Sequence, residues 1–328
     1  VQVSISNQAI SDFLSLGYII GKETIYNEIL ELEPGTILRF DLNTAETKKH
    51  KYWEFPTQSQ EILSQPQIIE QVEKRLKESI RLRLRSDVPV GVFLSGGIDS
   101  GLITALAASE SAIPLKTFTV SFGASVFDES SLARMVAARY GTEHTEIKLE
   151  PDIEQLLPRV VRSFDEPFAD PSAFPTYAIS QEASKYVKVV LNGEGSDELF
   201  GGYRRIQAMR IIQKIQGGLN FLPENTLKII TNLLPEPKGF RTKYSFLHRF
   251  ARAAQLDPYL RYLVWSSDGF NSEDKKELKF IKSSVTLDIR EQLSERFFEY
   301  SKLKPLPQFM ALDLSLIHIS EPTRQEAI

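Results

Sequence analysis

From Val88 onward, short runs of β-branched and apolar residues alternate with longer amphipathic segments. The apolar runs predict strands at 88–94, 115–121, 143–149 and 186–192. The amphipathic segments predict helices near 98–110, 128–140, 153–164 and 174–184. Alternation of this kind builds right-handed βαβ units, so we expect an α/β fold with a doubly wound parallel sheet. Ligands of such sheets bind at the carboxyl ends of the strands, near the switch in strand order.

The remaining patterns are helical, apart from one hairpin. Residues 36–40 alternate as a strand, and Asp41 to Thr44 would turn the chain back into 48–53. Apolar positions at helical spacing predict helices at 7–16, 67–85, 205–216, 224–233, 244–254 and 285–301. Prolines at 223, 235, 237 and 258 interrupt the region after Tyr203. The arginines that end helix 67–85 are expected to complement its C-terminus in solvent rather than to touch phosphate.

A small polar loop, Ser95-Gly96-Gly97-Ile98-Asp99-Ser100, follows the first strand of the alternating region. A glycine turn that leads into a helix N-terminus leaves backbone N–H groups unpaired, and these groups attract an anion. A carboxylate at Asp99 would repel that anion unless a divalent cation lay between them, which favours a Mg²⁺ ligand. The alternative is a plain strand-to-helix turn that Asp99 or Ser100 caps. The loop is not a Walker A motif, because the lysine is absent and the spacing differs.

A second loop, Asn192-Gly193-Glu194-Gly195-Ser196-Asp197-Glu198, follows the strand that ends near 192. Glycines on both sides of Glu194 let a carboxylate and backbone amides approach a ligand together, and Asp197 is a candidate second Mg²⁺ ligand. Taken alone, the segment fits equally well the alternative of an acidic surface turn in which Ser196 caps the next helix. Paired with the first loop across one sheet, it predicts the opposite wall of one ATP–Mg²⁺ site.

Composition excludes several classes of function. The net charge is −4 without a long basic tract, so no electrostatic signature of a nucleic-acid or membrane partner is present. The chain has no cysteine, which excludes disulfides, cysteine-ligated zinc and a thiol nucleophile within it. No apolar run has the length of a membrane span, and no signal peptide is visible. We expect a cytoplasmic location.

The two loops carry a family resemblance. Ser95 to Ser100 resembles the pyrophosphate loop of the N-type ATP pyrophosphatases, which have the adenine nucleotide alpha hydrolase-like fold. Residues 193–203 (GEGSDELFGGY) resemble the motif of the asparagine synthases, which use glutamine as their ammonia source. The hairpin at 36–40 and the pair Tyr52-Trp53 are similar to the end of the glutamine-hydrolysing domain of that family.

The resemblance implies roles for individual residues. Glu194 would lie beside an acyl-adenylate and act in forming it and in handling the incoming ammonia. Asp99 and Asp197 would hold Mg²⁺ on the pyrophosphate. The ATP-binding residues by this resemblance are Leu94, Ser95, Gly96, Gly97, Asp99, Ser100, Val120, Asn192 and Gly193, with Leu94 and Val120 near the adenine. Asn192 departs from the serine that the family usually has, and we expect altered nucleotide contacts there.

A third stretch, 164–173, resembles the family loop that faces the amino-acid substrate. Its candidate substrate residues are Asp165, Glu166, Asp170 and Ser172, since carboxylates suit an α-ammonium group and a hydroxyl suits a carboxylate. A helix-capping loop is nearly as good an interpretation. Asp128 and Glu129 open a predicted helix and are expected to cap it. The four histidines are far apart in the sequence and are assigned no chemistry.

The resemblance also implies a domain organisation. Residues 1–55 are expected to be the C-terminal remnant of a class II glutamine amidotransferase domain, 56–66 a linker, and 67–314 an incomplete ATP-pyrophosphatase domain. Residues 315–328 resemble translated adapter sequence and are expected to be a non-native tail. The chain therefore reads as a fragment truncated at both ends of its parent.

The function expected from this resemblance is ATP-dependent amide ligation. The parent would convert aspartate to asparagine through a β-aspartyl-AMP intermediate, with ATP and Mg²⁺ as cofactors and ammonia from glutamine. Small-molecule substrates are the expected partners, and a homodimer of the parent is compatible with the sequence. We expect the fragment to bind ATP–Mg²⁺ but to turn over poorly. The alternatives are a relative that activates another carboxylate, such as a peptide or natural-product precursor, and a non-catalytic ATP-binding fragment.

Overall fold

The computed structural model divides the chain into two compact units. It describes residues 2–56, 63–123, 128–148, 153–219, 223, 226–233, 235, 242–267, 269–270, 272–278 and 288–317. Unit 1 contains residues 1–59, 166–169 and 197–324, and unit 2 contains 60–165, 170–196 and 325–328. Because each unit has its own hydrophobic clusters, each is described by itself.

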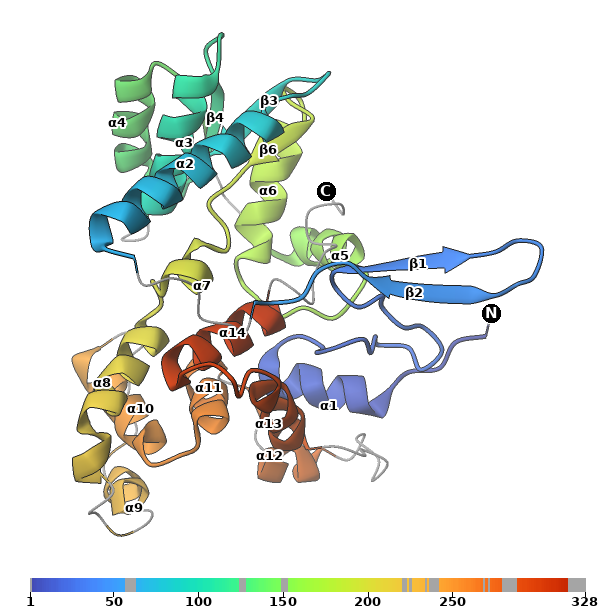
Figure 1. The fold of residues 1–328 in the computed structure, drawn as a ribbon, viewed down its shortest axis with the longest axis vertical. Helices are drawn as coiled ribbons and strands as arrows, with labels where there is room; N and C mark the ends of the chain where they lie inside the picture. The colour runs from blue at the N-terminus through green and yellow to red at the C-terminus, as the bar shows by residue number, and fades with distance from the viewer. Residues whose placement is uncertain are drawn as a thin grey trace. The chain divides into compact units, whose positions relative to one another are not determined.

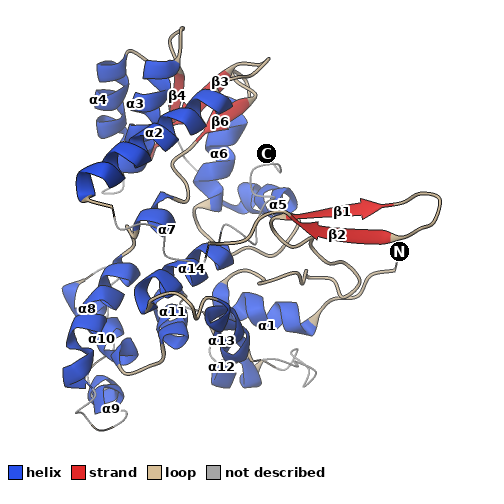
Figure 2. Ribbon diagram, in the orientation of Figure 1, coloured by secondary structure: helices blue, strands red, loops and turns tan. Residues whose placement is uncertain are grey.

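Unit 2 is built on a four-stranded sheet in the order β5-β4-β3-β6. The strands are β3 (Val90–Phe93), β4 (Lys116–Ser121), β5 (Glu143–Lys148) and β6 (Val189–Leu191). All three pairings are parallel, with Val92 opposite both Thr117 and Leu191. The predicted parallel sheet is confirmed, and Figures 1 and 2 show its strands among helices.

Helices cover both faces of this sheet. They are α2 (Gln65–Arg83), α3 (Ile98–Glu110), α4 (Ser130–Tyr140) and α6 (Ala173–Ala183), and α5 (Ile153–Phe164) packs against α6. Successive side chains of a strand point to opposite faces. Accordingly, Val92 packs in a cluster with Ile80 of α2 and Leu106 of α3, whereas Phe93 packs in a cluster with Ile179 of α6. The sheet is therefore doubly wound, as predicted.

The direction of winding reverses at β3. From β3 the chain moves outward to β4 and then β5, and it returns to place β6 on the other side of β3. Neighbouring parallel strands end at the same edge of a sheet, so the loops after β3 and β6 emerge side by side. The topology thus brings together the two loops that the sequence singles out.

Unit 1 is helical, with one hairpin. Its helices are α1 (Asn7–Leu16), α7 (Ser196–Phe200), α8 (Arg204–Leu219), α9 (Thr226–Leu233), α10 (Lys243–Ala254), α11 (Pro258–Ser266), α12 (Ser272–Glu277), α13 (Ile289–Glu299) and α14 (Pro305–Ile317). Residues from α1, α8, α11, α13 and α14 share one core, in which Tyr262, Leu293, Phe309, Leu312 and Leu316 are fully buried.

The predicted hairpin is confirmed as β1 (Thr36–Phe40) paired antiparallel with β2 (Thr47–Lys51). Its turn is braced by Asp41, whose Oδ1 accepts hydrogen bonds from the N–H groups of Asn43 (2.9 Å) and Thr44 (3.1 Å). An aspartate that bonds the backbone two residues ahead is a common turn device, which explains why the sequence predicts this turn correctly.

Element ends differ from the predictions by a few residues. Helix α2 begins at Gln65 because Ser64 and Gln67 form a capping box, and α4 begins at Ser130, after its cap. The predicted linker lies mostly outside the described residues, and so do residues 318–328 of the predicted tail. Ser315 to Ile317 continue α14, and Leu316 is buried. Among the described helices, none is long and apolar enough to cross a membrane.

Candidate functional site

The loop after β3 is held in shape by its own hydroxyl groups. Ser100 Oγ lies 2.8 Å from Ser95 Oγ and accepts a hydrogen bond from the Ser95 N–H at 3.1 Å, and Gly97 N–H donates to Ser95 Oγ at 3.1 Å. Helix α3 starts directly afterwards, with Gly97 as a cap that has no side chain. The first N–H groups of α3 have no acceptor within the described part of the chain, so they are free to bind an anion.

The loop after β6 packs against the start of α3. A Cβ atom added to Gly193 would lie 2.9 Å from Ser100 N and 3.0 Å from Asp99 Cβ, so only glycine lets the two loops approach this closely. Asn192 and Glu194 contact each other at 3.4 Å through the Asn192 side-chain amide. The two predicted loops therefore form one site, on a single edge of the unit 2 sheet.

Together the loops enclose a pocket of about 370 Å³. Of the predicted ATP-binding and catalytic residues, those that line it are Leu94, Ser95, Gly97, Asp99, Ser100, Val120, Asn192, Gly193 and Glu194. Gly96 belongs to the same loop but packs against Glu129 and Leu132 instead. The roles of these residues toward a nucleotide stay predictions.

The pocket lining combines carboxylates with apolar side chains. Three carboxylates, Asp99, Glu129 and Glu194, line it, and its described lining contains no lysine, arginine or histidine. Apolar side chains complete the wall, namely Phe93, Leu94, Val120, Phe122 and Ile179. Carboxylates repel a polyphosphate unless a cation neutralises them, whereas the apolar wall suits a flat aromatic group.

The sequence analysis missed several lining residues. They are Phe93, Thr119, Phe122, Glu129, Pro175, Thr176 and Ile179. Phe122 and Glu129 follow the carboxyl end of β4, so the rule that ligands bind at strand ends could have identified them. Pro175, Thr176 and Ile179 come from α6, whose packing against the sheet brings them to the pocket; no local pattern signals this.

The Asp128 side chain caps α4, as predicted, whereas the Glu129 side chain contacts the β3 loop. Asp128 accepts hydrogen bonds from Ser121 Oγ (2.7 Å) and the Ser130 N–H (2.8 Å), and these bonds lower its pKa to about 2. Glu129 makes no side-chain cap; its carboxylate accepts from the Gly96 N–H at 3.1 Å. The side-chain cap is therefore made by Asp128, whereas Glu129 occupies the N-cap position of α4 without a side-chain cap.

The third stretch does not line the pocket. Asp170 Oδ1 accepts a hydrogen bond from the Ser172 N–H at 2.8 Å, and Ser172 precedes the first residue of α6. Asp165 lies in unit 2 with a positive φ of 56°, and Glu166 lies in unit 1, where it accepts from the Ile25 N–H at 3.4 Å. The Asp170 contact matches the helix-capping alternative, and the substrate role of the four residues stays a prediction.

Asp197 belongs to unit 1, at the start of α7. Its carbonyl accepts from the Gly202 N–H at 2.9 Å, and a side chain at Gly202 would collide with its carboxylate. The loop from Asp197 to Gly202 is thus closed on itself. A shared metal-binding role with Asp99, which lies in unit 2, stays a prediction.

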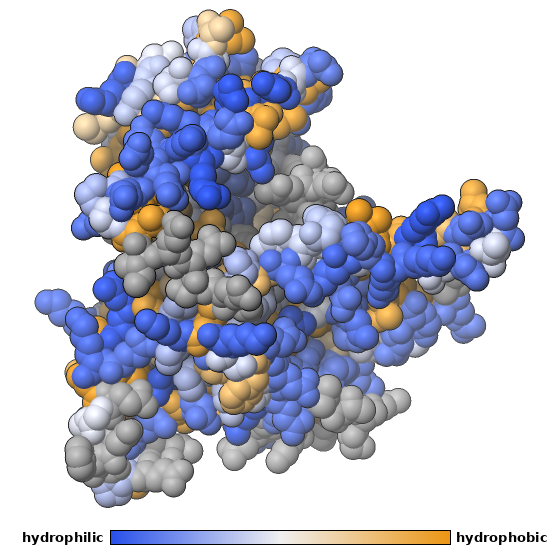
Figure 3. Space-filling view, viewed as in Figure 1, coloured by the Kyte–Doolittle hydropathy of each residue, from blue (hydrophilic) through white to orange (hydrophobic). Residues whose placement is uncertain are grey.

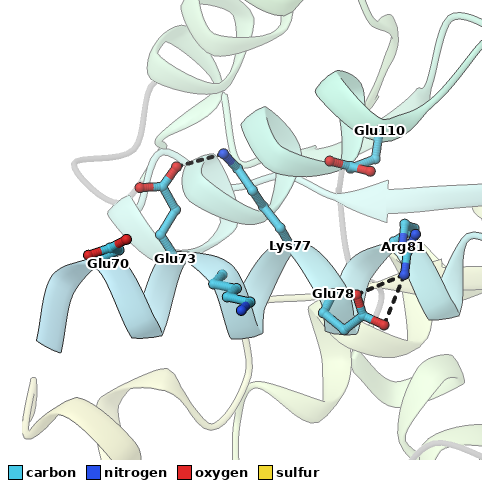
Figure 4. A pocket seen from close by; sticks show the side chains of 7 residues that line it. Glu70, Glu73, Lys77, Glu78, Arg81 and Glu110 are labelled. Carbon is cyan, nitrogen blue, oxygen red and sulfur yellow. Dashed lines mark hydrogen bonds and ion pairs between the residues drawn. The ribbon is translucent and has the colours of Figure 1, made fainter. Parts of the chain in front are cut away.

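A second depression is lined wholly by charged side chains, which come from α2 and, at Glu110, from α3 (Figure 4). Lys77 pairs with Glu73 at 2.6 Å and Arg81 pairs with Glu78 at 2.9 Å. Arg83 donates to the Ser79 carbonyl one turn earlier, in agreement with the predicted solvent role of these arginines. Figure 3 shows that this part of the surface is hydrophilic. Ion pairs along α2 account for most of these charges without a ligand.

Comparison with known proteins identifies the family. The asparagine synthase family model matches residues 71–324. Asparagine synthetase (glutamine-hydrolyzing) 1 of Bacillus subtilis is 32% identical over 318 residues, which cover 95% of this chain and 48% of that protein. A Methanocaldococcus jannaschii relative, also described as a glutamine-hydrolysing asparagine synthetase, is 38% identical over 202 residues, 61% of this chain and 39% of its own length.

More distant similarities include amidase chry2 of Gibberella zeae, 33% identical over 210 residues that cover 58% of this chain and 31% of that protein. Among solved structures, a glutamine-dependent NAD⁺ synthetase from Acinetobacter baumannii has a TM-score of 0.32 at 18% identity, covering 90% of this chain and 60% of that one. The chain spans less than half the length of the two synthetase relatives. By the extent of the family match, the chain belongs to the asparagine synthase family.

Proposed function

We propose that the pocket between the β3 and β6 loops binds ATP with Mg²⁺ and that the parent protein is an ATP-dependent amide ligase. One observation carries the proposal: the free N–H groups at the start of α3 and three carboxylates face the same pocket, which has no cationic side chain in its described lining. Such a pocket takes a polyphosphate only when a divalent cation comes with it.

The residues present fit a magnesium ion that is shared with phosphate. No group of three or more potential metal ligands gathers in the described parts of the chain, so a cage made of protein ligands alone is not available there. Mg²⁺ is usually bound by one or two carboxylates together with substrate phosphates. Asp99 would supply the carboxylate of this pocket, and the ion would neutralise the phosphate charge.

The other residues of the pocket would position the reactants. The amides and hydroxyls of Ser95, Gly97 and Ser100 would hold the phosphates, and Leu94 and Val120 would contact the adenine. Glu194 would lie next to the activated carbonyl, where it could orient the incoming ammonia and accept its proton. Most of the rate enhancement in such a site comes from positioning and from stabilisation of charge.

For the complete reaction we propose that the β-carboxylate oxygen of aspartate attacks the α-phosphorus of ATP and releases pyrophosphate. Ammonia then displaces AMP and gives asparagine. Hydrolysis of glutamine as the ammonia source, a homodimeric parent and a cytoplasmic location belong to the same proposal. It is supported by the family membership and by the similarity to glutamine-hydrolysing asparagine synthetases.

A ligase that activates a different carboxylate is the second candidate. The similarity to a fungal amidase favours it. Pyrophosphate exchange with a panel of carboxylic acids, measured on the full-length parent, separates the two candidates. Exchange that depends on aspartate alone supports asparagine synthesis.

Calorimetric titration of the whole chain with ATP tests the nucleotide site. We expect ATP binding to require Mg²⁺. We also expect Asp99→Asn to weaken this binding by roughly tenfold or more, which corresponds to about 1.4 kcal/mol. Asp87→Asn is the matched control, because Asp87 is an exposed aspartate that precedes β3, at the opposite edge of the sheet. Equal affinities for the two variants, or binding that ignores Mg²⁺, would contradict the metal assignment.

A further inference from the structure

One backbone amide of the β3 loop is already bonded to a carboxylate. The Gly96 N–H donates to Glu129 Oε2 at 3.1 Å. The neighbouring N–H groups of Ser95 and Gly97 donate to serine hydroxyls of the same loop, which carry no charge. Glu129 comes from another segment, immediately before α4, and is the anion that this loop binds in the described structure.

The backbone around Glu129 is held firmly. Its carbonyl accepts from the N–H groups of Leu132 (3.0 Å) and Ala133 (3.1 Å), so it forms part of the first turn of α4. A Cβ atom at Gly96 would lie only 2.8 Å from Glu129 Cβ and 2.9 Å from Leu132 Cβ. Gly96 therefore packs directly against this turn, and the Glu129 carboxylate is delivered to the loop by α4.

The contact is nevertheless easy to break. Glu129 is exposed and also lines the pocket, where Asp99 and Glu194 carry the other two carboxylates. The Glu129 carboxylate that accepts this hydrogen bond is exposed, so water offsets much of its strength, and a phosphate oxygen is an equally good acceptor for the same N–H. A phosphate that approaches Gly96 meets the negative charge of Glu129 at the same position.

We propose that Glu129 competes with phosphate for the loop: its carboxylate occupies the Gly96 amide when the pocket is empty and must leave when a phosphate group binds. The inference rests on the proposed nucleotide site. Glu129 then lowers the affinity for phosphate-bearing ligands, and it does so most for ligands whose charge is not neutralised by a cation. Ligands without phosphate do not encounter this competition.

The test compares pyrophosphate with adenosine on the whole chain. Glu129→Gln keeps the size of the side chain and removes its charge. We expect this variant to bind pyrophosphate in the presence of Mg²⁺ with a Kd lower by roughly three- to tenfold, as expected for loss of one charged competitor. Adenosine should bind equally to both proteins. Isothermal titration of both ligands measures the two values.

Glu143→Gln is the matched control, because Glu143 is exposed, begins β5 at the opposite edge of the same sheet and pairs with Lys116 at 3.1 Å. Unchanged or weaker pyrophosphate binding by Glu129→Gln overturns the inference, and so does an equal gain in the control or in adenosine binding. If the unaltered protein binds neither ATP–Mg²⁺ nor pyrophosphate, the proposed nucleotide site fails instead, so the two failures are distinguishable.

Discussion

At the scale of single residues, Asp12 is a carboxylate whose burial has measurable consequences. It lies on α1 in unit 1 and is 0% exposed. Its Oδ1 accepts hydrogen bonds from the side-chain amides of Gln8 and Gln292, both at 2.9 Å, whereas Oδ2 has no hydrogen-bond partner in the part of the chain that the structure describes. Burial outweighs these bonds and raises the pKa of Asp12 to about 6.

This raised pKa predicts a pH-dependent loss of stability. The folded state keeps the Asp12 proton up to about pH 6, whereas the unfolded chain loses it near the ordinary pKa of 3.8. The free energy of unfolding therefore falls as the pH rises from 4 to 6. Asp12→Asn removes this penalty, so we expect the variant to be more stable than the original protein at pH 7 by about 2–3 kcal/mol.

Urea unfolding of both proteins between pH 4 and pH 7 measures the difference. The stabilities should converge near pH 4 and separate as the pH rises. Asp41→Asn is a useful comparison. Hydrogen bonds from Thr44 and Asn43 lower the pKa of the Asp41 carboxyl, so its contribution to stability changes with pH in the opposite direction. A constant difference between Asp12→Asn and the original protein at all pH values would contradict the prediction.

At the scale of elements, a buried ion pair joins α8 to α14. Arg205 donates from Nε and from one terminal nitrogen to the two carboxylate oxygens of Asp313, at 3.0 and 2.8 Å. Asp313 is 0% exposed, and the Arg205 guanidinium lies 3.6 Å from the centre of the Tyr203 ring. The pair fixes the position of α14 against the helix that follows the second motif.

Asp313→Asn tests this pair. The substitution leaves a buried guanidinium without its counter-charge, so we expect it to destabilise the protein by about 3–5 kcal/mol. Denaturant titration measures the loss. Glu143→Gln breaks the exposed pair with Lys116 at 3.1 Å and should change stability by less than about 1 kcal/mol. Equal effects of the two substitutions would show that burial of the Arg205 pair is unimportant.

Local sequence patterns predict most elements but not all of them. The strands and the helices from α2 to α6 follow from local patterns, because short apolar runs alternate with longer segments of helical length. The short helix α7 lies inside a glycine-rich motif, where the glycines outweigh the helical signal. Pro258 is expected to interrupt a helix, yet it occupies the first turn of α11, where proline is compatible with helical geometry.

At the scale of the whole molecule, each unit has separate hydrophobic clusters. The large cluster of unit 1 contains Leu293 and Leu312, and the clusters of unit 2 contain Val92, Phe118 and Leu94. No described cluster contains residues of both units. We infer that a cavity created in the core of one unit destabilises that unit more than the other.

Leu293→Ala tests this inference. Leu293 is 0% exposed, so its truncation should cost about 2–5 kcal/mol. Hydrogen exchange should accelerate in α1, α8, α11, α13 and α14 and stay slow in β3, β4 and β6. Leu102→Ala, at a position that is 45% exposed, is the control and should change exchange little. Equal acceleration in both units would show that they unfold together.

The sequence by itself determined the local features of this protein. Strand and helix periods, the Asp41 turn, the Asp128 cap and the two glycine-containing loops all depend on residues close together in the chain, and local sterics and hydrogen bonds are sufficient to specify them. Those loops also carry the family resemblance. They could be placed at one edge of a sheet because parallel strands end together.

Tertiary structure decided which other residues reach the pocket. Ile179 and Thr176 belong to α6, and they line the pocket only because that helix packs on the sheet face opposite α3. Glu129 looks like a helix cap in the sequence, but the packing of α4 against Gly96 delivers its carboxylate to the loop instead. Contacts of this kind join segments far apart in the chain, so they depend on how side chains fill the space between elements and leave no periodic signal in the sequence.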